Sequence, residues 1–353
     1  MAAQFGGDDT TSSAAVLRRI GLLQLDALRR VDRAHNLTCL ARMSANASVA
    51  MVDGQLWSPG PATVFETWVH AACLVPAEDW PLLRLARARA VNRAEQPSGA
   101  AYAEVLAIVG DSEHGVTIRE IEGASGRTDG WDWSERKRAA EWLLWRGELI
   151  CSERRANRRV YDLPERRLLA TTIQTDLSRE VILETLARRV LGSLGVATAH
   201  DIATYYNLTP EDTAEGLALC NAIPVTAESW SEQAWMLSAT QLPRSASLRE
   251  PRLIGPFDNL IWDRERTRRV HNFDYTFEAY KPAHKRTYGH YVMGVLNTTH
   301  QFLGRVDLQR KNGHLDVIRS FPEANVGKDD FHAALVTAVD VLANQLGATL
   351  STP

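Results

Sequence analysis

The order of elements predicted between residues 98 and 170 constrains the fold of this chain more than any other feature. An apolar helix over 102–109 precedes a second helix, which opens at the capping box Thr117–Glu120. Ser134 can cap a third helix, and a two-stranded hairpin follows over 149–162. Three helices and a hairpin in this order are typical of a winged helix, whose third helix occupies the recognition position.

The tip of this hairpin is rich in arginine, although the chain as a whole is slightly acidic. The 353 residues carry a formal net charge of −3, so a surface for nucleic acid must be local. Residues 127–167 contain 11 Lys+Arg against 8 Asp+Glu. Arg155, Arg158 and Arg159 are therefore candidates for contact with DNA phosphates, and a hairpin that merely faces solvent is the alternative.

A second unit with the same order is predicted over 171–245. Apolar residues line a helix over 183–191, and further helices open at Thr198–Asp201 and Thr209-Pro210. Strands over 223–226 and 234–237 complete it. Its third helix carries Glu211, Asp212 and Glu215, which repel phosphate, so we expect this unit to act as scaffold.

Residues 246–353 predict a small β-rich, barrel-like domain closed by a helix over 329–346. Asn312-Gly313 lies between two strands, and both residues tolerate the positive φ of a tight hairpin turn. Lys281, Lys285 and Arg286 are candidates for contact with the DNA backbone, and Trp262 or Tyr288 for a wedge against a distorted duplex. Three other charged residues are expected to form buried ion pairs instead: Asp258, Asp263 and Arg266.

Gln24 and Asp26, within the apolar run 20–28, form the candidate catalytic pair. In an extended stretch or a tight turn, side chains at i and i+2 point the same way, whereas in a helix they lie about 200° apart. A carboxylate among apolar residues can deprotonate a water or stabilise a developing cation, and the amide can hold that water. On these residues alone, a helix cap is an alternative role for Asp26.

Two neighbouring stretches supply further candidates. Arg33 and His35 can contact phosphate beside the reaction centre, or face solvent. Residues 61–76 predict a helix bounded by prolines, with apolar residues at i, i+3, i+4 and i+7. On another face of that helix, Glu66 and His70 lie four apart and can pair.

Several of these stretches together resemble the winged-helix DNA glycosylases of the AlkZ/YcaQ superfamily. The resemblance rests on residues 20–26 with 33–35, on 64–76, and on 256–266 with 273–286 and 304–307. It implies a third winged-helix unit in residues 1–97, an α+β fold of three tandem units in a C-shaped cradle, and Gln24 and Asp26 at the reaction centre. It also places His70 beside the lesion.

The implied activity is that of a monofunctional glycosylase, which removes N7-alkylated purines from double-stranded DNA, including bulky or crosslinked adducts, in DNA repair or antibiotic self-resistance. An N7-alkylated guanine is cationic and leaves easily, so an anionic group beside an oxocarbenium-like transition state would suffice. A non-catalytic winged-helix transcriptional regulator is the alternative, because one fold serves both functions.

No metal or cofactor is expected. The four cysteines, Cys39, Cys73, Cys151 and Cys220, form no CxxC pair, and no His/Cys/Asp cluster has the spacing of metal ligands. The first residues do not read as a signal peptide, and no apolar run approaches the roughly 18 residues of a membrane span. We therefore expect a cytoplasmic monomer that associates with the nucleoid when bound to DNA.

Overall fold

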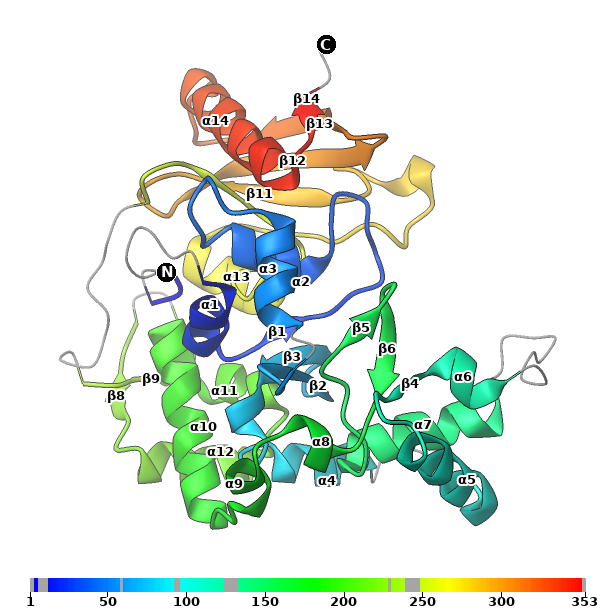
Figure 1. Cartoon of the computed structure of the whole chain (residues 1–353). Helices are drawn as coiled ribbons and strands as arrows, with labels where there is room; N and C mark the ends of the chain where they lie inside the picture. The colour runs from blue at the N-terminus through cyan, green and yellow to red at the C-terminus, as the bar shows by residue number, and fades with distance from the viewer. Residues whose placement is uncertain are drawn as a thin grey trace.

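The computed structural model of the chain shows a mixed α+β fold (Figure 1). It describes residues 3–5, 12–57, 60–91, 96–123, 133–227, 230–238 and 248–350. None of the helices in this described part combines the length and apolar character needed to cross a bilayer.

Three segments repeat one order of elements: helix, short strand, two helices and a two-stranded hairpin. The first contains α1 (Ser13–Ile20), β1 (Leu23–Gln24), α2 (Ala34–Leu40), α3 (Val49–Leu56), β2 (Val64–Trp68) and β3 (Ala72–Pro76). The second contains α5 (Gly99–Gly110), β4 (Val116–Thr117), α6 (Ile118–Glu122), α7 (Glu135–Arg146), β5 (Arg154–Arg155) and β6 (Arg158–Tyr161). The third contains α10 (Arg179–Leu194), β7 (Val196–Thr198), α11 (Ala199–Tyr206), α12 (Pro210–Leu219), β8 (Ile223–Val225) and β9 (Ala234–Met236).

The three sheets also share one strand order, in which the third strand of each segment lies between the first and the second: β1-β3-β2, β4-β6-β5 and β7-β9-β8. Four short helical elements connect the segments: η1 (Ala77–Asp79), α4 (Arg84–Val91), α8 (Pro164–Arg167) and α9 (Ala170–Gln174).

In the second segment the predicted elements form as expected. Ser134 caps α7 by accepting a hydrogen bond from the Lys137 amide, and Gly147 ends the helix with a positive φ. The hairpin turns at Ala156 and Asn157, which both have positive φ. The elements predicted for the third segment are also confirmed, including the capping box of α11.

The helix predicted over 61–76 is wrong, because the structure has the hairpin β2–β3 there. Thr67 pairs with Cys73 and Trp68 with Ala72, and the chain turns between these pairs. Four of the five residues of β2 are buried, so the strand lacks the alternation that would distinguish it from a helix. The predicted pairing of Glu66 with His70 across one helical turn is therefore also wrong.

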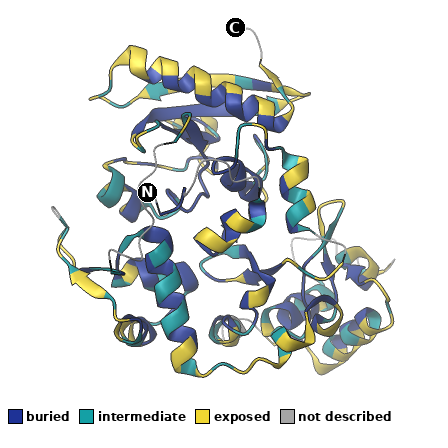
Figure 2. Cartoon of the chain, turned by 60° about the vertical axis from the view of Figure 1, so that its left-hand side comes forward, coloured by how far each residue is buried: buried dark blue, intermediate teal, exposed yellow. Residues whose placement is uncertain are grey.

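The C-terminal region is a curled, half-barrel sheet with strand order β10-β11-β12-β13-β14. Its elements are β10 (Arg252–Ile254), α13 (Arg264–His271), η3 (Ala283–Lys285), β11 (Val292–Leu296), β12 (Phe302–Lys311), β13 (His314–Pro322), α14 (Lys328–Leu346) and β14 (Thr349–Leu350). Asn312 and Gly313 make the predicted turn, both with positive φ. Buried and exposed residues alternate along α14, which packs one face on the sheet (Figure 2).

The first segment lies in the middle of the molecule, between the C-terminal sheet above it and the other two segments below it in Figure 1. One hydrophobic core joins Leu37 and Leu40 of α2 to Met293 of the sheet and Leu342 of α14. A second core joins Phe65 of the first hairpin to the helices of the third segment. The start of the chain is therefore held on two sides by residues from its second half.

Candidate active site

Gln24 ends the short strand β1, which pairs with β3 so that Gln24 lies opposite Cys73. This pairing places the Gln24 side chain beside the turn of the first hairpin. Its Oε1 lies 3.3 Å from Nε2 of His70. The sequence places these residues 46 positions apart, and the sheet brings them together.

His70 is held in this turn by a ring on one face and a carbonyl at its edge. Its imidazole stacks on the Trp262 indole, with ring centroids 4.0 Å apart and planes at 15°. Its Nδ1 lies 3.4 Å from the carbonyl oxygen of Tyr205. Burial lowers the pKa of His70 to about 4, although the Tyr205 carbonyl opposes the shift, so the ring is neutral near pH 7.

Asp26 follows the strand, where the backbone is no longer part of the sheet. Its Oδ1 accepts a hydrogen bond of 2.8 Å from the Leu28 amide. The side chain is about half-buried, and this burial raises the pKa of Asp26, although the Leu28 hydrogen bond opposes the shift. Asp26 makes no ion pair with any residue that the structure describes, so this carboxylate is available for chemistry.

Asp26 lines a cavity of about 480 Å³ between the loop after β1 and the hairpin of the second segment. Cationic side chains dominate its wall: Arg29, Arg33, Lys137, Arg154, Arg158 and Arg159. The other carboxylate there, Glu141, is hydrogen-bonded to Arg159 and Tyr161. The cavity therefore attracts an anionic ligand and presents it with one unpaired carboxylate.

Asn259 and Tyr205 hold the backbone that leads into β1. The Asn259 amide donates to the carbonyl oxygen of Leu22 at 3.2 Å and to Oη of Tyr205 at 2.6 Å. Tyr205 Oη in turn donates to the carbonyl oxygen of Ile20 at 2.6 Å. These buried hydrogen bonds fix the backbone just before Gln24.

A carboxylate of raised pKa beside a cationic cavity suits the stabilisation of positive charge on a sugar that is bound through its phosphates. The family model described as DNA glycosylase AlkZ-like matches residues 17–348 of this chain. The chain belongs to the AlkZ-like DNA glycosylase family. It is thus a DNA glycosylase, a hydrolase that acts on N-glycosyl bonds.

A solved structure agrees with the fold of this AlkZ-like glycosylase. The DNA glycosylase AlkZ of Streptomyces sahachiroi is similar with a TM-score of 0.62 and 16% sequence identity. The match covers 99% of this chain and 95% of that chain. At this identity the likeness supports the shared fold, and the roles of single residues are argued below from their contacts.

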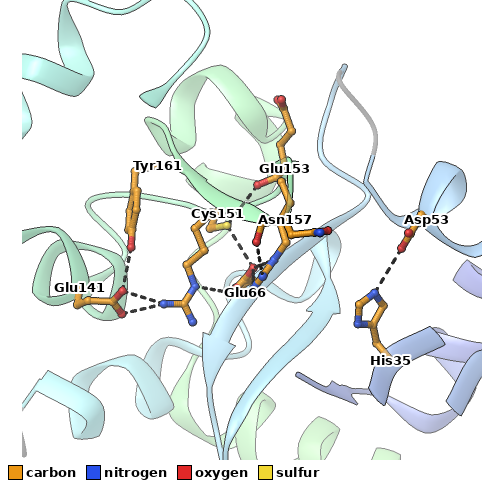
Figure 3. A network of polar contacts seen from close by, with 10 residues as sticks. His35, Asp53, Glu66, Glu141, Cys151, Glu153, Asn157 and Tyr161 are labelled. Atoms are coloured by element: carbon orange, nitrogen blue, oxygen red, sulfur yellow. Dashed lines mark hydrogen bonds and ion pairs between the residues drawn. The ribbon is translucent and has the colours of Figure 1, made fainter. Parts of the chain in front are cut away.

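The hairpin of the second segment is joined to the first segment by a buried ionic network (Figure 3). Glu66 of β2 accepts from Nε of Arg154 at 2.7 Å and from Nε of Arg159 at 2.6 Å. Arg159 also donates to both carboxylate oxygens of Glu141, at 2.8 and 3.0 Å. Burial alone would raise the pKa of Glu66, but the two guanidinium groups outweigh it and hold the pKa below its usual value.

The three predicted hairpin arginines therefore differ in their surroundings. Arg159 is committed to two carboxylates, and Arg155 donates to Glu153 at 3.0 Å and to the Gly115 carbonyl at 3.3 Å. Arg158 is exposed and contacts no partner among the residues that the structure describes. Contact of these arginines with DNA stays a prediction, and Arg158 is the freest to make it.

Arg33 and His35 both line the Asp26 cavity, as their predicted role requires. His35 is buried, with Nε2 3.4 Å from Oδ1 of Asp53 and its ring edge-on to Trp57. Burial lowers the pKa of His35 in spite of the Asp53 carboxylate. His35 thus presents a mostly neutral ring to the cavity, whereas Arg33 presents a charge.

Lys281, Lys285 and Arg286 lie together on the loop between α13 and β11. Glu278, which is buried, accepts from Lys281 Nζ at 3.1 Å, and Arg286 donates to the carbonyl oxygens of Ala279 and Lys281. These bonds brace the loop and leave Lys285 exposed. The DNA contacts predicted for the three residues are not tested by this geometry.

Trp262, predicted as a wedge, has one face covered by His70 and a buried indole nitrogen. Tyr288 packs edge-on against Phe321. Sequence reasoning missed Tyr280, whose side chain is 79% exposed beside the basic loop residues. The signal that could have found it was its position next to Lys281, an aromatic and a cation in sequence.

The predicted buried ion pairs of this region are confirmed for two of three residues. Asp258 contacts Arg42 at 2.6 Å, and Arg266 contacts Asp201 at 2.7 Å, all within the interior. Asp263 instead caps α13 by accepting from the Arg266 amide. These residues hold the segments together and are distinct from the cavity wall.

Proposed function

We propose that this glycosylase is monofunctional and hydrolyses the N-glycosidic bond of N7-alkylated purines in double-stranded DNA, bulky adducts or crosslinks included. Such an enzyme would act as a monomer in DNA repair or in antibiotic self-resistance. The observation that carries the proposal is Asp26, an unpaired and half-buried carboxylate on the wall of a cavity lined by cations.

The chemistry asks little of the enzyme beyond this carboxylate. An N7-alkylated purine carries a positive charge, so it leaves with the electron pair of the glycosidic bond and becomes neutral without a general acid. Positive charge develops on the sugar, and in this proposal the Asp26 carboxylate stabilises it. A water then adds to C1′ and gives its proton to Asp26, while Gln24 orients the water.

In this proposal, the cationic residues of the cavity wall bind the DNA backbone of the substrate. Duplex DNA carries about one negative charge per 1.7 Å of its axis, so cations beside the carboxylate position the backbone without reading sequence. Arg33 and Arg158 in the cavity, and Lys285 on the C-terminal loop, are the proposed phosphate contacts. Bulky lesions are proposed from the family resemblance, which implies an open cradle rather than a pocket for an extruded base.

We also propose that the three repeated segments are winged-helix units over 1–97, 98–170 and 171–245, in a C-shaped cradle with a C-terminal domain over 246–353. The shared order of helices and strands supports this, and so does the common strand order of the three sheets. The boundary at 245/246 lies outside the described residues.

Release of the alkylated base tests the proposed substrate class. Duplexes that contain N7-methylguanine or a bulkier N7 adduct are incubated with the enzyme, and free base and abasic sites are measured before and after alkali. We expect wild-type protein to release base and to leave the strand intact without alkali. Protein that binds the duplex and releases no alkylated base would refute the proposed substrate class.

Two variants test the assignment of Asp26. Asp26→Asn should bind the duplex as wild type does and lose base release by about 100-fold or more, as expected when a catalytic acid–base group is removed. Asp111→Asn makes the same chemical change on the exposed surface of the second segment and should behave as wild type. Normal release by Asp26→Asn would show that another group stabilises the sugar.

A further inference from the structure

The two ring nitrogens of His70 both face hydrogen-bond acceptors as the side chains are placed. Nδ1 faces the carbonyl oxygen of Tyr205 at 3.4 Å, and Nε2 faces Oε1 of Gln24 at 3.3 Å. A neutral imidazole carries one proton, so it can donate to only one of them. One of these two contacts must therefore be arranged differently.

The Tyr205 carbonyl is the acceptor that cannot turn. It belongs to the backbone of α11, and the Tyr205 hydroxyl is tied by hydrogen bonds to Asn259 and Ile20. A primary amide, in contrast, can exchange its oxygen and nitrogen by a half-turn, and the two ends have nearly the same shape. The proton is therefore expected on Nδ1 of His70, and the amide of Gln24 is the group that adapts.

A second neighbour is compatible with a lone pair on Nε2. The Sγ of Cys73, which is buried in β3, lies 4.0 Å from this nitrogen. Burial raises the pKa of this thiol, so it keeps its proton and can offer a weak S–H donor to the ring. Both Cys73 and the NH2 group of Gln24 then point donors at the same acceptor.

We propose that His70 is a positioning residue that fixes the Gln24 amide, with its NH2 group donating to Nε2 and its carbonyl oxygen facing away from the ring. The stack on Trp262 and the bond to Tyr205 hold the imidazole in place for this task. On the proposed function, Gln24 then offers the attacking water an acceptor rather than a donor. A water held this way directs its lone pair at C1′ while Asp26 takes its proton.

The doubly protonated ring would donate to both acceptors and so keep the opposite amide orientation. It would require a cation within a stack of buried rings, without a carboxylate in contact among the described residues. The low pKa of His70 agrees with the neutral form. A neutral ring with its proton on Nδ1, facing the fixed Tyr205 carbonyl, therefore selects one of the two orientations of Gln24.

The first experiment determines the protonation state of the His70 ring and does not depend on enzyme activity. In 15N-labelled protein, long-range 1H–15N correlation spectra distinguish the two neutral tautomers and the imidazolium. The chain has ten histidines, and the His70 signals are identified by their loss in His70→Phe. We expect a proton on Nδ1 at neutral pH, and a ring protonated on Nε2 would overturn the proposal even if base release is normal.

The second experiment separates positioning from packing by a double-mutant cycle. His70→Phe keeps an aromatic ring on Trp262 and loses both hydrogen bonds, so kcat for base release should fall about tenfold with KM unchanged, as expected for one lost hydrogen bond. In a Gln24→Ala background the same change should have no further effect, because the residue on which His70 acts is gone. Additive losses in the double variant would show that His70 acts through the fold instead.

The two readouts also separate this proposal from the proposed function. Wild-type protein that releases no base would refute the glycosylase chemistry proposed here, and the tautomer could still be measured. Protein that releases base with a proton on Nε2 would leave the function standing and refute the role of His70.

Discussion

Glu66 offers a sharp test of how the first two segments are held together. The residue is only 2% exposed, and its carboxylate contacts Arg154 and Arg159. Its backbone amide donates a hydrogen bond to the Cys151 carbonyl at 2.8 Å. Glu66→Gln keeps the size of the side chain and removes the charge. Two guanidinium groups then lose their shared counter-charge at the junction between segments.

The expected cost follows from the surroundings of each arginine. Removal of one partner from a buried ion pair typically costs about 3–5 kcal/mol. The side chains of Arg154 and Arg159 are 20% and 22% exposed, so water recovers part of this, and Arg159 keeps Glu141. We therefore expect the lower end of the range, about 3 kcal/mol in the free energy of unfolding.

The free energy of unfolding of the wild-type protein should also depend on pH, in a direction that follows from the pKa of Glu66. Because the pKa of folded Glu66 is lowered, its contribution to stability is fully present above the value of about 4.3 for a free glutamate. That contribution is lost as the pH falls through the folded pKa. Glu66→Gln should lack this part of the acid destabilisation.

Urea unfolding followed by tryptophan fluorescence measures the change. Glu78→Gln is the matched control, because Glu78 pairs with Arg18 on the surface, with side chains 48% and 63% exposed. A surface pair of this kind contributes about 0–1 kcal/mol. If Glu66→Gln shifts the unfolding curve no more than Glu78→Gln does, the buried network does not stabilise the junction and the reasoning fails.

Three further predictions concern activity and binding. Burial raises the pKa of Asp26 above the usual aspartate value of 3.8, so the single-turnover rate of base release should rise with pH through a midpoint above 3.8 and then level. A midpoint at or below 3.8 would contradict the assignment of Asp26. Arg158→Ala should reduce the slope of log K against log[salt] for duplex binding by about one, whereas an unchanged slope would exclude a phosphate contact. Tyr280→Ala should weaken binding to damaged duplex by about 1 kcal/mol, as expected for a lost base stack, and Tyr280→Phe should restore it in a fluorescence anisotropy titration.

The parts of the fold that could be predicted are those with local chemical signals. Ser134, Thr198 and Asn312-Gly313 each satisfy the backbone at a helix start or a turn, so short stretches of sequence fix their conformation. The hairpin at 64–76 lacks such a signal. Its apolar residues fit the period of a helix because both faces of β2 are buried, against α4 on one side and the second segment on the other.

The residue types of the candidate site could be named from the sequence, whereas their contacts could not. The pattern around Gln24 and Asp26 predicts an extended stretch or a tight turn, and the structure has the short strand β1 there, with Asp26 just after it. The network of Glu66 joins residues that are 88 and 93 positions apart, and nothing local to Arg154 or Arg159 indicates which carboxylate it meets. Excess positive charge at a hairpin predicts a DNA surface there, but it cannot indicate that Arg154 and Arg159 also bind protein carboxylates, so contact of the hairpin with DNA stays a prediction.

The two stretches that most identify the family are held against each other in space. The Asn259 amide donates a hydrogen bond to the carbonyl oxygen of Leu22, 237 positions earlier in the chain. Trp262 stacks on the His70 ring, which faces Gln24. A backbone carbonyl buried beside β1 needs a donor, and the C-terminal region provides one together with the aromatic face behind His70. Gln24 and Asp26 come from the first segment, but side chains of the last region hold the backbone before Gln24 and the ring that faces its amide, so the candidate site depends on the assembled chain rather than on its first hundred residues.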